Sequence, residues 1–250
     1  MSRSLLAVSL NVLLLFALLA CGGFAQAEKL DVTVGWTKPP YVIEQGNTGF
    51  ELELVRAVFK RMGHDLTFIY LPFGRSYDLV KLGKVDVGMT LSLKFDISPA
   101  KFSEPYIIYQ NVAISLKGRG ISLGEIADLA KYSIVGFQNA NIILGEQYSR
   151  AVQSSPFYVE LPEQMKQVEM LLKGRTDVVV MDVNIFNYLS KELLGKSHME
   201  NVDVHRIFPV NPYRLGILDD VLRQEFNRQL QIFKETEQYQ QLLQQYDFLQ

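Results

Sequence analysis

Residues 89–106 read MTLSLKFDISPAKFSEPY and begin at the end of a strand that we predict over residues 85–90. Ligands of open α/β sheets bind outside the carboxyl ends of the strands. We therefore expect this strand end, with Thr90 and Ser92 as its polar residues, to line a ligand cleft. No arginine follows before Tyr106, and the charged residues there are Lys94, Asp96, Lys101 and Glu104.

The segments before this stretch alternate between strand and helix patterns. Apolar residues alternate with polar ones over 30–34, which indicates a strand. Over 50–62 they recur with helical spacing, with acids in the first turn and basic residues in the last. A strand over 66–71 and a short helix over 76–82 follow. This order predicts an α/β fold with a mainly parallel sheet.

The second half of the chain repeats the alternation. Its predicted strands cover 112–116, 133–137, 157–161, 177–181, 202–208 and 214–218. Its predicted helices cover 123–130, 140–150, 163–172, 184–194 and the tail from 219 onward.

Two segments far apart in the chain resemble each other. Residues 80–87 (VKLGKVDV) and 171–178 (LLKGRTDV) both combine a helix end, a glycine and an aspartate that opens an apolar strand. This repetition favours two lobes of similar construction. Their strand ends, at Thr90–Ser92 and at Met181–Asp182, would then meet at a common cleft.

The first residues are typical of an export signal. Arg3 precedes an apolar run over 5–20, and Ala25-Gln26-Ala27 matches an A-x-A cleavage site. The run is shorter than the roughly 20 apolar residues of a membrane span. Cleavage after Ala27 leaves 223 of the 250 residues, and we expect a periplasmic protein. Alternatively, Cys21 becomes a lipid anchor. It is the only cysteine, so an intramolecular disulfide is excluded.

Composition narrows the choice of partners. The formal net charge is −2, it becomes −3 without Arg3, and no block of basic residues occurs. Nucleic acids and anionic membranes are therefore poor partners. We expect a monomer without a cofactor.

Two catalytic motifs are weak. Residues 120–124 match G-x-S-x-G, but a loop rather than a buried strand precedes them, and Ser122 with Glu125 fits a helix capping box. The three histidines have no metal-ligand or triad partners at useful spacing. These patterns therefore do not indicate a hydrolase, a zinc site or a catalytic triad.

Several single residues have two interpretations. Asp182, after the apolar strand 178–181, either caps the next helix or faces a ligand cation. Trp36 and Phe73 lie in loops after strands, where aromatic rings either pack internally or wall a pocket. The charge of Arg75 is unfavourable at a helix start, which favours another role.

Together these residues resemble the amino-acid class of bacterial periplasmic solute-binding proteins, the two-lobed Venus-flytrap receptors of ABC importers. The resemblance rests on the order and spacing of short motifs, which are residues 39–41, 49–54, 83–86, 102–106, 174–177, 182, 213–217 and 239–248. It implies a discontinuous first lobe over 28–108 and 213–250, a second lobe over 109–212, and two hinge crossings between two mixed, mainly parallel sheets.

The resemblance also implies ligand contacts. The stacking aromatic ring falls on Phe73, the first-loop contact on Trp36 and Lys38, and the aspartate that binds an α-ammonium on Asp182. The loop whose amides help to hold a carboxylate falls on residues 138–141, with Asn139 and Asn141. Asp96 stands where the family has a carboxylate-binding arginine.

We therefore expect capture of a small polar solute for an ABC permease or a membrane sensor. Without the arginine, the solute is an amine or lacks an ordinary α-carboxylate. Alternatively, Arg75 or Lys94 holds the carboxylate from another direction. A further alternative is an enzyme resembling cyclohexadienyl dehydratases, with Asp182 as the acid.

Overall fold

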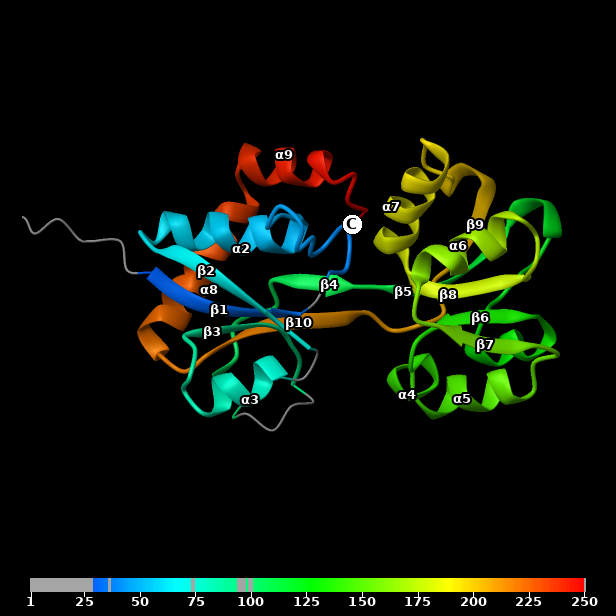
Figure 1. Ribbon diagram of the computed structural model, residues 1–250, viewed down its shortest axis with the longest axis horizontal. Helices are drawn as coiled ribbons and strands as arrows, with labels where there is room; N and C mark the ends of the chain where they lie inside the picture. Colours follow the sequence, from blue (N-terminus) through cyan, green and yellow to red (C-terminus); the bar gives the residue numbers. More distant parts are fainter. Residues whose placement is uncertain (1–28, 36, 73–74, 94–97, 99–100, 250) are drawn as a thin grey trace, which may run out of the picture.

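The computed structural model describes residues 29–35, 37–72, 75–93, 98 and 101–249 of the chain. The predictions for Trp36, Phe73, Lys94 and Asp96, and those for the export signal and Cys21, lie outside these residues. The structure has two lobes side by side, each with a five-stranded sheet flanked by helices (Figure 1). The predicted α/β fold with two mixed sheets is thereby confirmed.

The first lobe contains a sheet of order β2-β1-β3-β10-β4. Its strands are β1 (Lys29–Gly35), β2 (Asp65–Leu71), β3 (Val87–Leu91), β4 (Ile107–Tyr109) and β10 (Asn211–Ile217). Strands β1, β2 and β3 are parallel, and β10 runs antiparallel between β3 and β4. The helices of this lobe are α2 (Phe50–Arg61), α3 (Arg75–Lys81), α8 (Asp220–Lys234) and α9 (Glu237–Gln245).

The second lobe contains a sheet of order β7-β6-β8-β5-β9. Its strands are β5 (Asn111–Leu116), β6 (Ile134–Phe137), β7 (Tyr158–Leu161), β8 (Val178–Asp182) and β9 (Val202–His205). Its α-helices are α4 (Ala140–Ile143), α5 (Glu146–Gln153), α6 (Gln164–Leu172) and α7 (Val183–Leu194). Three short 3-10 helices, η2 (Lys117–Arg119), η3 (Ile126–Lys131) and η4 (Met199–Asn201), complete this lobe.

Two predicted helices of the second lobe differ from the structure. The helix expected over 140–150 is broken into α4 and α5 by Gly145, whose φ of 86° is incompatible with a continuous helix. The helix expected over 123–130 is the 3-10 helix η3. Its capping box pairs Glu125 with Asp128, because the Asp128 carboxylate accepts the Gly124 and Glu125 amides. The capping role predicted for Ser122 was wrong, because the N-cap is Glu125, about one turn later.

The end of the 89–106 stretch pairs with the returning chain. The Ser103 amide donates to the Leu215 carbonyl at 2.9 Å, and the Leu215 amide donates to the Ser103 hydroxyl at 2.9 Å. The Tyr106 amide donates to the Tyr213 carbonyl. The chain then enters the second lobe through Gln110 and returns to the first between β9 and β10. These bonds hold the two crossings together as one hinge.

A buried carboxylate lies directly behind the hinge. Glu51 on α2 is fully buried and accepts hydrogen bonds from the hydroxyls of Thr90 at 2.7 Å, Tyr109 at 2.6 Å and Tyr106. Thr90 has a φ of 57° where the register between β3 and β10 shifts. This left-handed conformation is unusual for a β-branched residue. The resulting bulge therefore turns a strand residue toward Glu51.

The C-terminal segment connects the two lobes through noncovalent contacts. The Phe248 ring stacks on Phe50 of α2 with centroids 3.9 Å apart. The next residue, Leu249, donates its amide to the Asn184 side chain of α7 at 2.7 Å. Asn187, one turn further along α7, donates to the Asp247 carbonyl at 3.0 Å. A segment that belongs to the first lobe is therefore bound to a helix of the second.

We predict that Glu51→Ala lowers the free energy of unfolding by about 3 kcal/mol or more. The variant leaves three buried hydroxyls without their acceptor, and each such loss costs about 1–3 kcal/mol. Urea unfolding measures the change. The control is Glu146→Ala, which removes an exposed helical ion pair with Arg150 and should cost less than about 0.5 kcal/mol. Equal costs for the two variants would contradict the structural role of Glu51.

Candidate functional site

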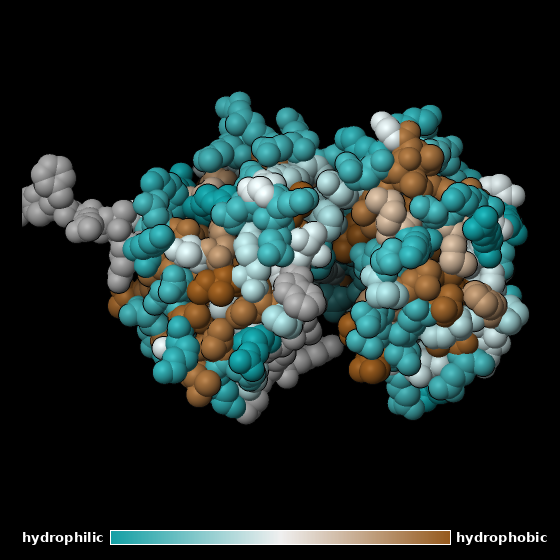
Figure 2. All heavy atoms as spheres, in the orientation of Figure 1, coloured by the Kyte–Doolittle hydropathy of each residue, from teal (hydrophilic) through white to brown (hydrophobic). Residues whose placement is uncertain are grey.

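A cavity of about 380 Å³ lies between the lobes. The first lobe contributes Gly35 at the end of β1 and the loop residues Thr37, Lys38 and Pro39. The second lobe contributes Pro162, Gln164, Met165, Ile185 and Leu189. The cavity therefore lies where strands β1 and β7 end, as expected for a ligand cleft in this kind of sheet. The surface between the lobes is hollowed (Figure 2).

Lys38 is the charged residue among the described residues of this cavity wall. Its ammonium lies 4.7 Å from the centroid of the Tyr109 ring, a cation–π contact. Burial lowers the pKa of Lys38, while the carboxylates of Glu51 and Asp182 act in the opposite direction. The predicted first-loop residue thus places its ammonium over an aromatic face, and the charges of two buried acids act on it.

Asp182 is the N-cap of α7. Its Oδ1 accepts from the Asn184 and Ile185 amides at 2.9 and 3.2 Å, and also from the Tyr41 hydroxyl at 2.9 Å. Its Oδ2 accepts from the Gln110 amide at 2.8 Å. The capping interpretation is confirmed. Burial raises the pKa of Asp182 to about 6, although these hydrogen bonds lower it.

Tyr41 forms the contact from the first lobe to Asp182. Its ring stacks on Tyr109 with centroids 3.8 Å apart and meets Phe248 edge-on at 5.2 Å. Its hydroxyl also accepts from the Asn184 amide group at 3.2 Å. The Pro-Pro-Tyr motif indicated the family, but not that its tyrosine would bind an aspartate 141 residues away.

The loop after β6 holds a carboxylate of the protein itself. The Asn139 amide donates to Glu160 Oε2 at 2.8 Å, and the Asn141 amide donates to Glu160 Oε1 at 2.9 Å. Tyr158 donates to Oε1 at 2.6 Å. The amides of Asn139 and Asn141 thus bind a carboxylate of the protein, whereas the resemblance implied that this loop helps to hold the carboxylate of a ligand. No local sequence pattern indicated Glu160 as that group.

The other predicted residues lie on other elements. Thr90 is 5% exposed and directed to Glu51. Ser92 is half-buried just beyond β3, and Arg75 is exposed at the first position of α3. The structure therefore brings Lys38 and Asp182 together with Tyr41, and it places Arg75, Ser92 and the Asn139–Asn141 loop on separate elements.

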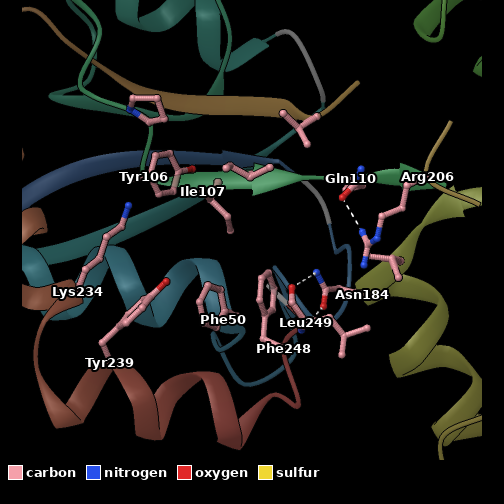
Figure 3. Close-up of a pocket in the computed structure, with 14 residues that line it drawn as sticks. Phe50, Tyr106, Ile107, Gln110, Asn184, Arg206, Lys234, Tyr239, Phe248 and Leu249 are labelled. Atoms are coloured by element: carbon pink, nitrogen blue, oxygen red, sulfur yellow. Dashed lines mark hydrogen bonds between the residues drawn. The ribbon is translucent and has the colours of Figure 1, made fainter. Parts of the chain in front are cut away.

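A second cavity of about 380 Å³ lies beside hinge strand β4 (Figure 3). It is mostly apolar, with Phe50, Tyr106, Ile107 and Phe248 among its walls. Two cations line it. Burial lowers the pKa of Lys234, and Arg206 donates to the Gln110 side chain at 2.6 Å.

Neither a metal-binding cluster nor a membrane-spanning helix occurs among the described residues. No group of three or more histidine, cysteine, aspartate or glutamate side chains there could hold a metal ion. No helix within the described ranges is long and apolar enough to cross a membrane.

The fold and the cleft define a two-lobed solute-binding protein. The family model for bacterial extracellular solute-binding proteins, family 3, matches residues 30–250. The chain belongs to this family, which confirms the class inferred from the motifs. No curated protein matches the chain.

Solved structures share the fold at low sequence identity. One is a substrate-binding protein of a polar amino acid ABC uptake transporter from Streptococcus thermophilus, 18% identical, with 90% of this chain and 92% of that chain covered and a TM-score of 0.67. Another is a histidine kinase sensor domain similar to periplasmic binding proteins. It is 20% identical, with 88% of this chain and 96% of that chain covered and a TM-score of 0.63. A third is an ancestral arginine-binding protein bound to arginine. It is 20% identical, with 88% of this chain and 99% of that chain covered and a TM-score of 0.60.

We predict that Asp182 makes stability depend on pH between 7 and 4. Its pKa is raised from 3.8 to about 6. The folded protein therefore binds a proton at a higher pH than the unfolded chain. This contribution is fully present below 3.8 and is lost as the pH rises through about 6. At about 1.4 kcal/mol per pKa unit, the full effect is on the order of 3 kcal/mol.

Urea unfolding of the wild type and of Asp182→Asn at several pH values measures this effect. The wild type should gain stability relative to the variant as the pH falls from 7 to 4. Asp219→Asn is the control, because it makes the same substitution at the exposed N-cap of α8. Parallel pH profiles for the wild type and Asp182→Asn would rule out the raised pKa.

Proposed function

We propose that the protein captures a small polar solute between its lobes in the periplasm and delivers it to an ABC permease. The cavity between the lobes carries this proposal, because both lobes wall it and a hinge joins them. Family membership over residues 30–250 supports binding as the activity. The export signal predicted from the first 27 residues supports the location.

Closure of the hinge would complete the site. A solute that contacts both walls stabilises the closed arrangement by its additional contacts there. A micromolar Kd corresponds to about 8 kcal/mol. An apolar wall with a few fixed polar groups can reach this value. Lys38, Thr37 and Gln164 are such groups in the described part of the cleft.

Presentation of the bound solute to a membrane sensor is the second use. The same fold occurs in the histidine kinase sensor domain and in the importer-associated binding protein. In either use the chain binds its solute without converting it. A dehydratase-like activity would need a cleft acid, and all four hydrogen bonds of the candidate Asp182 go to groups of the protein. Turnover of prephenate or arogenate would overturn this assignment.

A thermal-shift screen with amino acids, amines, organic acids and sugars tests the proposal. At least one solute should raise the melting temperature, and small-angle scattering should show compaction on its addition. Lys38→Met should weaken its binding by about 10- to 100-fold, because a hydrogen bond to a charged group contributes about 1.5–3 kcal/mol. Lys60→Met, on an exposed helix end, is the control. Stabilisation without compaction, or equal affinity in Lys38→Met, would count against capture between the lobes.

Loss of uptake of that solute in cells that lack the gene would favour delivery over sensing. A lost transcriptional or kinase response with normal uptake would favour the sensor.

A further inference from the structure

The cavity beside hinge strand β4, which we call the hinge cavity, is built from both lobes (Figure 3). The first lobe lines it with Phe50, Lys234, Tyr239 and Phe248, and the second lobe with Val183, Asn184 and Arg206. Small-molecule pockets lie preferentially at such domain interfaces, with volumes of roughly 300–1,000 Å³. The volume of about 380 Å³ lies within this range. The hinge cavity therefore has the position and the size of a ligand site.

The hinge cavity is separate from the cavity in which we propose solute capture. The two cavities have no described lining residue in common. Asn184 lines the hinge cavity, whereas the next residue of α7, Ile185, lines the cavity between the lobes. A compound in the hinge cavity would therefore bind in addition to the captured solute.

Lys234 gives the hinge cavity a charge that the protein does not balance. The side chain is half-buried at the end of α8, and burial lowers its pKa. Among the described residues, its ammonium has no hydrogen-bond or ion-pair partner, and the lining includes no aspartate or glutamate. Figure 3 shows the side chain extending from α8 toward β4. Because burial of an unpaired charge is costly, an anion in the cavity would be stabilised here.

Two further donors belong to the hinge cavity. The Tyr239 hydroxyl has no hydrogen-bond partner within the described part of the chain, and Figure 3 shows it pointing into the cavity. Burial raises the pKa of Tyr239, so the hydroxyl keeps its proton. At the other end, Arg206 donates to the neutral side chain of Gln110 at 2.6 Å. The polar groups of the cavity are therefore mainly suited to an anion.

The wall between these donors is apolar. Phe50, Ile107 and Phe248 lie between Lys234 and Arg206 (Figure 3). Two exposed apolar side chains also line the cavity, Ile108 with 51% and Val210 with 50% of the residue accessible. Exposed apolar side chains that gather around a hollow are typical of a binding site. A ligand that fits this wall has an apolar body.

We propose that the hinge cavity binds a small carboxylate with an apolar body. Its carboxylate pairs with the Lys234 ammonium and accepts from the Tyr239 hydroxyl, and its body packs on the apolar wall. A single negative charge matches the single half-buried ammonium. This site goes beyond the proposed function, since it takes a second ligand.

The first experiment compares compounds that share one alkyl chain. Isothermal titration of the mature protein uses hexanoate, hexanamide and hexylamine, together with acetate. Hexanoate should bind at least about tenfold more tightly than each of the others. The amide lacks the ion pair, the like charge of Lys234 disfavours the amine, and acetate buries little apolar surface. Absence of hexanoate binding would overturn the proposal, as would equal or tighter binding of any of the other three.

Variants of Lys234 locate the compound. Lys234→Met removes the ammonium and keeps an unbranched apolar chain, and it should weaken hexanoate binding by about tenfold or more. Lys234→Arg should restore most of the affinity. Lys173→Met is the matched control, because Lys173 also lies at a helix end but pairs with Glu169 at an exposed position. Equal affinity of the wild type and a folded Lys234→Met protein would contradict the site.

The cleft variant Lys38→Met separates the two sites. Hexanoate should bind this variant as tightly as the wild type. Weaker binding to Lys38→Met, with unchanged binding to Lys234→Met, would assign hexanoate to the cavity between the lobes. That outcome would remove the hinge site and leave solute capture intact. If no solute binds between the lobes, hexanoate binding that depends on Lys234 would still support the hinge site.

Discussion

The buried carboxylate of Glu51 is the constraint on which the first lobe and the hinge depend. An ionised group without water must be paired or fully hydrogen-bonded. Its three hydroxyl donors come from the bulged strand β3, from the segment before β4 and from β4 itself. The Lys38 ammonium supplies opposite charge. One acid on α2 thereby connects the cleft strand, the hinge strand and the segment that precedes the hinge strand.

The second lobe uses its own carboxylates in a comparable way. Asp182 binds the start of α7, the hinge amide of Gln110 and the hydroxyl of Tyr41 from the other lobe. Glu160 binds the loop after β6. Both acids lie at strand ends, where ligands of such sheets bind. The resemblance assigns Asp182 and the loop after β6 to a ligand, but in the structure both form hydrogen bonds with other groups of the protein. The polar groups without such bonds determine which solutes the cleft can bind.

The periodicity of apolar residues was sufficient to predict the two α/β lobes, and the repeated helix–glycine–aspartate pattern indicated their similarity. The site was less predictable. The contact between Tyr41 and Asp182 joins residues 141 apart, and the contact of Glu160 with Asn139 depends on which strands are neighbours. The local spacing of apolar residues does not specify which strands become neighbours in a sheet. The break at Gly145 was missed because the positive φ of that glycine interrupts the helical pattern. The cap was placed at Ser122 and not at Glu125 because the capping hydrogen bonds form with Asp128.

The contact of the C-terminal segment with α7 bears on the mechanics of the molecule. Two bodies connected at the two hinge crossings retain rotation about the line that joins these points. The bonds of Leu249 with Asn184 and of Asp247 with Asn187 add a third attachment point. When that point lies off the line, rotation requires the attachment to stretch or break. The tail then acts as a mechanical stop, and the amplitude of the hinge is set by side-chain amides on α7 as well as by the hinge strands.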